Sequence, residues 1–146
     1  MQRVVLHTSV LVSGVRSRAG ASHVVLRIVA ARALIPIATP ALFLEYEDVL
    51  KRPEQRAISG LSIKQADDLL AALASAIEPT LVHFTWRPQL LDAGDEMVLD
   101  AAVNGRADAL ITHNVGDFAA AGARFGLPVL RPSELLERMG PWVLTL

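Results

Sequence analysis

The sequence contains no cysteine among its 146 residues, which excludes disulfide scaffolds, thiol nucleophiles and cysteine-bound zinc or iron–sulfur centres. Long hydrophobic runs are also missing, and none approaches the ~20 residues that span a bilayer. The amino terminus lacks the pattern of a signal peptide, so we expect a cytoplasmic protein with no membrane segment. The histidines lie too far apart for a local zinc motif of the H-E-x-x-H type: His7, His23, His83 and His113.

Charge of neither sign dominates the chain. Fourteen basic residues against fifteen acidic ones give a net charge of −1, so no strong overall field attracts nucleic acid. A dedicated sequence-specific DNA-binding domain is disfavoured, because such domains are usually basic. Apolar residues make up 52% of the chain, which excludes a disordered protein and predicts a single domain over residues 1–146.

Short apolar runs alternate with amphipathic segments along the chain. We predict strands at residues 4–6, 35–38, 80–84, 108–112 and 127–130. We predict helices from Ser22 as cap to about Arg32, from Thr39-Pro40 to before Pro53, from Ser62 onward, over 94–105 and over 132–139, with a short turn or helix around Asp117-Phe118. This alternation predicts an α/β fold with a mainly parallel sheet, in which catalytic groups lie at the carboxyl ends of the strands.

Acidic residues cluster at these strand ends or on the adjoining helices. Glu45 lies on the helix after the second strand, Asp95 and Glu96 open a later helix, and Asn114 and Asp117 follow a strand. Oxygen ligands that converge from separate segments are what Mg²⁺ or Mn²⁺ requires. A structural interpretation stays open beside this one, because carboxylates in the first turn of a helix also stabilise the helix dipole.

Four segments resemble the PIN domain family. They are residues 4–13 (the first strand and its turn), 39–53 (the second helix), 95–105 and 107–118 (two acidic segments), and the Arg124-Phe-Gly and Pro132-Ser-Glu-Leu-Leu segments fit as well. The resemblance runs in order over residues 3–138 and is closest to bacterial toxin components of toxin–antitoxin systems. It implies a three-layer α/β/α sandwich with a mainly parallel central sheet, and cleavage of RNA with one or two Mg²⁺ or Mn²⁺ ions. It also implies a homodimer and a cognate antitoxin protein.

The resemblance assigns the metal site residue by residue. The catalytic carboxylates of the family fall on Glu45, Glu96 and Asp117, with Asp95 and Asn114 beside them as further metal ligands. An antitoxin is expected to reach this acidic pocket with Arg or Lys side chains, because these cations pair with carboxylates.

The first strand departs from the family pattern. His7 stands where the family has Asp, and Ser9 stands where it has Asn, while Thr8 between them is kept. An imidazole suits Mn²⁺ better than the hard Mg²⁺ ion, so Mn²⁺ is favoured if His7 is a ligand. His7 is either that ligand or a charge substitute paired with Asp117 or Glu96, and the sequence leaves both interpretations open.

Substrate contacts are predicted on either side of this strand. Thr8 and Ser9 lie at its end, and Arg16 and Arg18 follow in a glycine-containing loop where they could steer an RNA phosphate. His113 could assist metal or phosphate binding. Trp86 could stack a base, although an aromatic residue before an X-Pro turn is more often a packing anchor.

Three functions follow from these observations. The first is a metal-dependent endoribonuclease toxin that His7 and Ser9 impair. The second is a catalytically inactive PIN-like domain that binds RNA or protein, which the same two residues favour. The third is a phosphatase-like or nucleotide enzyme on a flavodoxin-like sheet, which the absence of a P-loop and of G-x-G-x-x-G in the sequence disfavours.

Overall fold

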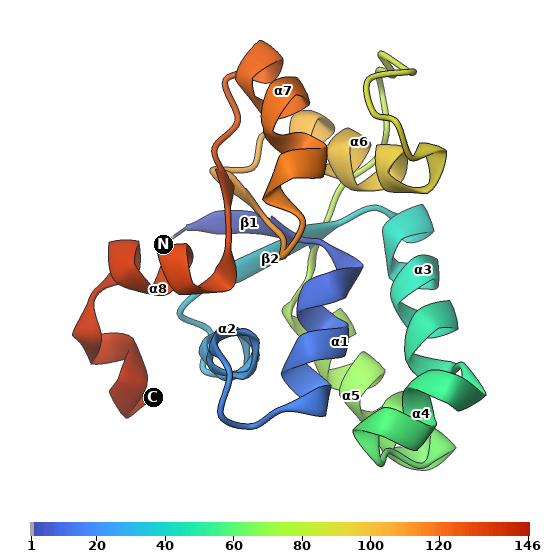
Figure 1. Ribbon diagram of the computed structural model, residues 1–146, viewed down its shortest axis with the longest axis vertical. Helices are drawn as coiled ribbons and strands as arrows, with labels where there is room; N and C mark the ends of the chain where they lie inside the picture. The colour runs from blue at the N-terminus through green and yellow to red at the C-terminus, as the bar shows by residue number, and fades with distance from the viewer. Residues whose placement is uncertain (1) are drawn as a thin grey trace.

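The computed structural model describes residues 2–146 of the chain (Figure 1). Over these residues, five parallel strands form one sheet in the order β3-β2-β1-β4-β5. The predicted parallel sheet is therefore confirmed, and the first strand lies at its centre. The strands are β1 (Arg3–Leu6), β2 (Ile35–Ala38), β3 (Glu78–Pro79), β4 (Ala109–Ile111) and β5 (Val129–Leu130).

Helices cover both faces of the sheet and complete the predicted three-layer sandwich. On one face lie α1 (Thr8–Arg16), α2 (Ala21–Ala30), α5 (Ile63–Ala76) and α8 (Pro132–Met139), and on the other lie α6 (Glu96–Asn104) and α7 (Val115–Phe125) (Figure 1). After β2, α3 (Pro40–Lys51) and α4 (Pro53–Ser59) pack beside α1. Short 3₁₀ turns complete the chain at η1 (Ala93–Asp95) and η2 (Pro141–Thr145). Within residues 2–146, no helix combines the length and apolarity needed to cross a membrane.

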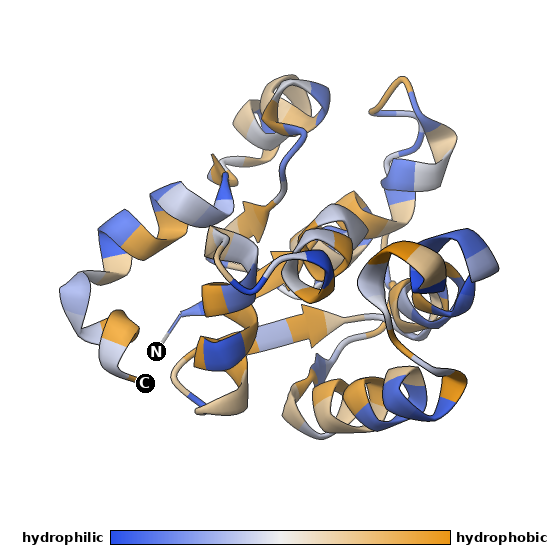
Figure 2. Ribbon diagram, turned by 60° about the horizontal axis from the view of Figure 1, so that its bottom comes forward, coloured by the Kyte–Doolittle hydropathy of each residue, from blue (hydrophilic) through white to orange (hydrophobic). Residues whose placement is uncertain are grey.

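β1 is apolar from Val4 to Leu6 and β4 is apolar throughout, as expected of strands whose two faces are both covered. Residues 4–6 and 109–111 are buried, and the register sets Leu6 opposite Ile111. Figure 2 shows these apolar strands at the middle of the molecule, with polar residues on the outer sides of the helices. The core therefore lies on both sides of β1 and β4, and it fixes the strand ends that carry the candidate site.

Two predicted helix starts are confirmed in detail. The side chain of Thr39 accepts a hydrogen bond from the Leu42 amide at 3.1 Å, with Pro40 in the first turn of α3. Ser62 and Gln65 form a capping box at the start of α5. These local signals are reliable because the bonds that satisfy a helix terminus come from residues close in sequence.

The strand predicted at residues 80–84 is wrong. Residues 81–92 contain no regular element before η1, and the third strand is β3. The reason is a side chain on α6: Asn104 Oδ1 accepts from the amides of His83 and Phe84, both at 2.9 Å, and its Nδ2 donates to the Phe84 carbonyl. Residues 83 and 84 are thus bonded to a helix and not to a neighbouring strand.

The loop predicted after the first strand is instead a helix. Residues 8–16 form α1, and only residues 17–20 connect it to α2. Gly14 lets the two helices approach closely, because a Cβ there would lie 2.5 Å from a side-chain carbon of Leu26. Ser22 is not the cap of α2, a position that Gly20 takes. The element expected around Asp117 is a full helix, α7.

Candidate functional site

His7 is the centre of a polar cluster at the carboxyl end of β1. It directly follows the strand, and it is 8% exposed. Its Nε2–H donates to Asp95 Oδ1 at 3.0 Å, because a carboxylate oxygen can only accept. The ring also packs edge-on against Phe118 of α7, with centroids 5.2 Å apart. Three elements distant in sequence, β1, η1 and α7, therefore meet at this imidazole.

The second ring nitrogen of His7 faces two hydroxyl groups. Nδ1 lies 2.9 Å from the hydroxyl oxygens of both Ser9 and Thr112. Each hydroxyl also accepts a backbone amide, from His113 at 3.2 Å and from Asn114 at 2.9 Å respectively. The ring thus links the first turn of α1 to the loop after β4, and a hydroxyl proton is available to Nδ1 when His7 is neutral.

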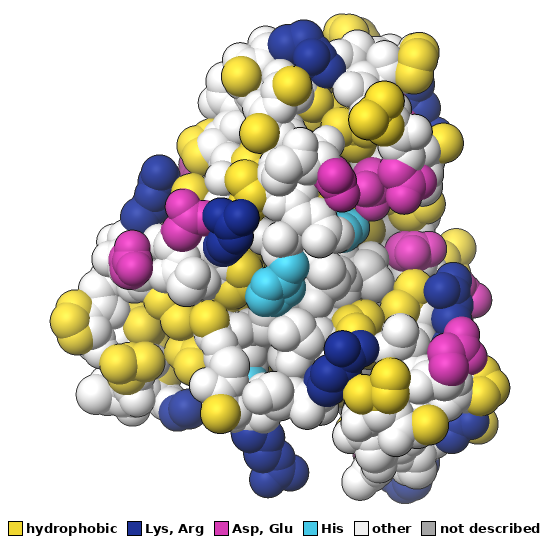
Figure 3. Space-filling model, viewed as in Figure 1, with side chains coloured by type: hydrophobic (Ala, Val, Ile, Leu, Met, Phe, Trp, Pro, Cys, Tyr) yellow, Lys and Arg dark blue, Asp and Glu magenta, His cyan; other side chains and the backbone are white. Residues whose placement is uncertain are grey.

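The environment of Asp95 disfavours its ionised form. Burial raises the pKa of Asp95 above its ordinary value, and His7 opposes that rise by its charge and its hydrogen bond. The charges of Asp92 and Asp117 raise the pKa of Asp95 further. Figure 3 shows acidic side chains gathered near the start of α6, beside a histidine that is largely covered. The site therefore concentrates negative charge next to one imidazole.

Glu96 lies outside this cluster, although the resemblance assigns it to the metal site. Its Oε1 accepts from the amides of Gln89 and Leu90, at 2.5 and 2.9 Å. Its Oε2 is buried, with no hydrogen-bond partner among the residues that the structure describes. Glu96 thus holds the loop before η1, and its neighbour Asp95 is the carboxylate that contacts His7.

Asp117 lies near Asp95 on α7, and Glu45 lies on α3. Glu45 is half-buried, and the next residue, Tyr46, donates its hydroxyl to the Leu6 carbonyl at 2.5 Å, which fixes α3 at the end of β1. Burial raises the pKa of the Tyr46 phenol far above its ordinary value, so this donor keeps its proton. Asp117 is exposed in the first turn of α7. The structure thus brings Asp117 close to Asp95, and the metal-binding roles of Glu45 and Asp117 stay predictions.

The predicted substrate contacts fall in different places. Thr8 is buried in the first turn of α1, and Asn114 is exposed at the start of α7. Arg16 and Arg18 are exposed, but α1 carries Arg16 about 12 Å along its axis from Thr8. The structure therefore gives the two arginines no contact with the cluster.

His113 is held by a serine that the sequence did not single out for this role. Ser22 on α2 lies 2.6 Å from His113 Nε2, so this pair links the loop after β4 to the helical layer. Burial lowers the pKa of His113, and the nearby charges of His7 and Arg131 lower it further. Thr112 was also missed, because a threonine at the end of a strand carries no chemical signal in the sequence. Its alignment with His7 depends on the pairing of β1 with β4.

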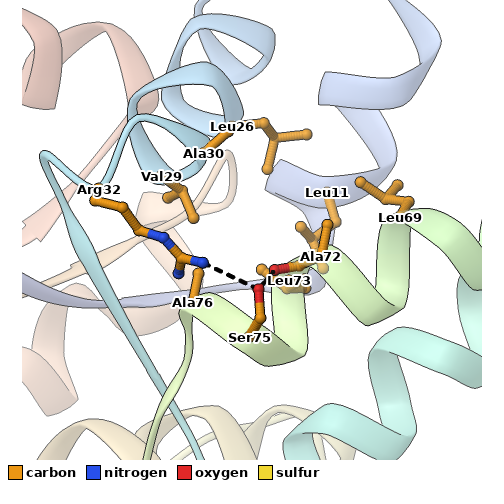
Figure 4. A pocket seen from close by; sticks show the side chains of 10 residues that line it. All are labelled: Leu11, Leu26, Val29, Ala30, Arg32, Leu69, Ala72, Leu73, Ser75 and Ala76. Atoms are coloured by element: carbon orange, nitrogen blue, oxygen red, sulfur yellow. Dashed lines mark hydrogen bonds between the residues drawn. The ribbon is translucent and has the colours of Figure 1, made fainter.

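A separate pocket of about 160 Å³ opens between α1, α2 and α5 (Figure 4). Its walls are mainly apolar, with Leu11, Leu26 and Leu73 among them. Arg32 donates to the Ser75 hydroxyl at its rim, at 3.1 Å. Its lining contains no acidic or histidine side chain, so it is not part of the cluster around His7.

The residues present do not form a ready site for the divalent ion that the resemblance implies. Within residues 2–146, no group of three or more histidine, aspartate or glutamate side chains is placed to hold a metal ion. The two donors that meet, His7 and Asp95, are bonded to each other. Glu96 Oε1 is already occupied by two backbone amides.

The chain is a parallel α/β/α domain, and acidic side chains gather around His7 at the carboxyl end of its central strand. A sequence profile described as PIN domain matches residues 3–116, which is more than half of the chain. The chain therefore belongs to the PIN domain family, as its motifs predicted. No curated protein matches it.

Among solved structures, the chain is similar to one chain of the "Crystal structure of VapBC2 from Rickettsia felis bound to a DNA fragment from their promoter". The TM-score is 0.58 at 12% sequence identity, and the match covers 88% of this chain and 98% of that one. At this identity the similarity shows the fold, and it extends over nearly the whole of both chains.

Proposed function

We propose that this chain is the toxin of a toxin–antitoxin pair and acts on RNA as an endoribonuclease whose site is restrained by His7. Membership of the PIN family and the fold shared with a chain of the VapBC2 structure support this proposal. The acidic edge at the end of β1 is the surface where cleavage would occur.

The observation that carries the proposal is the bond between His7 and Asp95. This bond places an imidazole where the resemblance implies an aspartate, and it occupies Asp95 Oδ1. When protonated, His7 also neutralises part of the charge that Asp95, Asp92 and Asp117 would otherwise present to a cation. The imidazole thereby bonds Asp95 and, when protonated, offsets part of the negative charge that an ion would offset according to the resemblance.

Among residues 2–146, the proposed cofactors Mg²⁺ or Mn²⁺ meet no assembled group of ligands. What the chain itself supplies is orientation. Ser9 and Thr112 fix the ring plane from one side, and Phe118 packs against it from another. Replacing the imidazole with a carboxylate leaves this frame in place and adds an oxygen ligand beside Asp95.

A second function, RNA or protein binding without cleavage, is favoured by the same bond. A site in which the donors satisfy each other keeps its shape without an ion. The two functions differ in one measurable respect, which is whether the chain as given hydrolyses a phosphodiester bond. The endoribonuclease toxin is proposed to form a homodimer and to bind an antitoxin. The antitoxin would reach Asp95 and Asp117 with basic side chains.

Cleavage of a fluorescent single-stranded RNA separates these functions. The wild-type chain, His7→Asp and His7→Asp with Ser9→Asn are assayed with Mg²⁺, with Mn²⁺ and with EDTA. We expect little cleavage by the wild type and at least a tenfold gain in His7→Asp, which is about 1.4 kcal/mol in the barrier. We expect a further gain in the double variant, because Ser9→Asn rebuilds the polar shell around the ligand.

The control is Asp95→Asn in the His7→Asp background, which should lose the gain. Equal cleavage by wild type and His7→Asp would show that His7 restrains nothing. RNA binding with no cleavage by any variant would leave the second function. Expression in a bacterial host tests the toxin assignment separately, because growth arrest by His7→Asp should be relieved by the antitoxin.

A further inference from the structure

Residues 81–92 expose apolar side chains on a frame that is held in place. Phe84 is 67% exposed and Trp86 is 43% exposed, which is unusual for large aromatic side chains lying next to each other. Their ring centroids lie 5.8 Å apart with planes tilted by 39°, and Trp86 packs edge-on against Phe125 of α7 at 5.4 Å. The indole is therefore fixed on one side and accessible on another.

Hydrogen bonds fix this segment at several points in the absence of regular structure. Asn104 binds the amides of residues 83 and 84, and Asp100 accepts from the Arg87 guanidinium at 3.0 and 2.6 Å. The side chain of Gln89 donates to the Trp86 carbonyl at 2.5 Å. Ordering exposed aromatic rings in this way lowers the entropy cost of binding a flat ligand.

Positive charge lies beside the rings. Arg124 donates to the carbonyl and the side-chain oxygen of Gln89, both at 2.9 Å. Arg124 forms no ion pair with a carboxylate among the residues that the structure describes. Arg87, within the loop itself, is half-exposed but is paired with Asp100, so within residues 2–146 Arg124 is the unpaired cation beside the rings. Aromatic rings beside an unpaired guanidinium group match the chemistry of single-stranded nucleic acid, in which each base has an apolar face and each linkage a negative charge.

The same loop is connected to the candidate site. The amide of Gln89 binds Glu96, and the residue before Glu96 is Asp95, which holds His7. From the other side, α7 carries Phe125 about 12 Å from Asp117 along its axis. A strand of RNA that lies on the acidic edge can therefore reach the rings.

We propose that Phe84 and Trp86, with Arg124 beside them, form a stacking platform for an unpaired base of the RNA substrate. The inference rests on the proposed action on RNA and names how that substrate is held. A second copy of the chain is the competing occupant. A two-fold contact centred on this patch would bring two Arg124 side chains together, which like charges oppose.

The test measures RNA binding without cleavage, in EDTA and at one fixed salt concentration. The chain has two tryptophans, so Trp142→Phe leaves Trp86 as the only indole reporter. An unstructured RNA oligonucleotide should quench its emission on titration. Anisotropy of labelled RNA should show that Trp86→Ala with Phe84→Ala weakens binding at least fivefold, whereas Trp86→Tyr with Phe84 intact retains most of the affinity.

Trp142→Ala is the matched control. Trp142 is 50% exposed on η2, and its removal should leave RNA affinity unchanged. Absence of quenching, or an equal loss in the Trp142→Ala variant, would overturn the platform. So would a Trp86→Ala variant that binds RNA normally but sediments as a smaller species, because the patch would then hold a second copy.

Failure of the proposed function looks different in the same experiment. Tight, quenching binding with no cleavage by any variant in any ion would keep the platform and refute the nuclease. Cleavage by His7→Asp at unchanged RNA affinity in Trp86→Ala with Phe84→Ala would keep the nuclease and refute the platform.

Discussion

Substitutions of Glu96 test whether its carboxylate has a structural role or a catalytic one. Glu96→Ala removes the oxygen that accepts the amides of Gln89 and Leu90, and each such charge-assisted bond contributes about 1.5–3 kcal/mol. Water can reach part of this half-buried loop and replace some of that interaction. We therefore expect the free energy of unfolding to fall by about 2–4 kcal/mol. Urea denaturation followed by tryptophan fluorescence measures this loss, because Trp86 lies in the same segment.

Glu96→Gln is the matched variant. It keeps an acceptor oxygen for both amides and removes the buried charge, so we expect a change in unfolding free energy below about 1 kcal/mol. Hydrogen exchange should show loss of protection at the amides of residues 89 and 90 in Glu96→Ala only. Equal losses in the two variants, or no loss in Glu96→Ala, would refute the loop-anchor role. If Glu96→Gln abolished cleavage in the His7→Asp background at unchanged stability, the carboxylate would be catalytic.

Burial raises the pKa of Asp95, so its contribution to stability is present below the ordinary aspartate pKa of about 3.9 and is lost as the pH rises through the raised value. Asp95→Asn should therefore flatten the acidic part of a profile of unfolding free energy against pH. Asp117→Asn should leave the melting temperature equal or higher, because it removes a charge that disfavours ionised Asp95. A fall in the free energy of unfolding above about 2 kcal/mol would instead indicate a structural role for Asp117. Thr39→Ala should cost about 1 kcal/mol in thermal unfolding, because the cap of α3 is lost. Sedimentation of the wild type at micromolar concentration should show a homodimer, and a monomer would contradict that expectation.

The sequence predicted the fold wherever local signals and the tertiary structure agreed. Buried strands and capped helices such as α3 carry their cause within a few residues, as the bond from Thr39 to the start of the helix shows. The strand expected at residues 80–84 failed because its partner was a side chain on α6, 20 residues away, which no local pattern reveals. The helix after β1 was missed because serine, glycine and arginine there resemble a loop, while the reason for Gly14 is the close approach of Leu26 on α2.

The candidate site was predicted less completely than the fold. His7 was singled out as the departure from the family pattern, and its partner was expected to be Glu96 or Asp117. The structure gives it Asp95 instead. Neighbouring residues at the start of a helix point in directions about 100° apart, so the sequence could not decide which carboxylate faces the strand end. The metal and substrate roles of these residues stay predictions.

The pairing of β1 with β4 has a consequence for how the chain folds. His7 and Thr112 meet across 105 residues of sequence, and the strands that bring them together form the middle of the sheet. Contacts of such long range are slow to form, because a large loop must close before the strands can pair. During synthesis, β1 emerges well before β4, and one of its apolar edges stays unpaired until β4 follows. The polar cluster around His7 therefore assembles among the last parts of the fold. A chain interrupted before β4 would expose an unpaired apolar edge of β1, which favours aggregation.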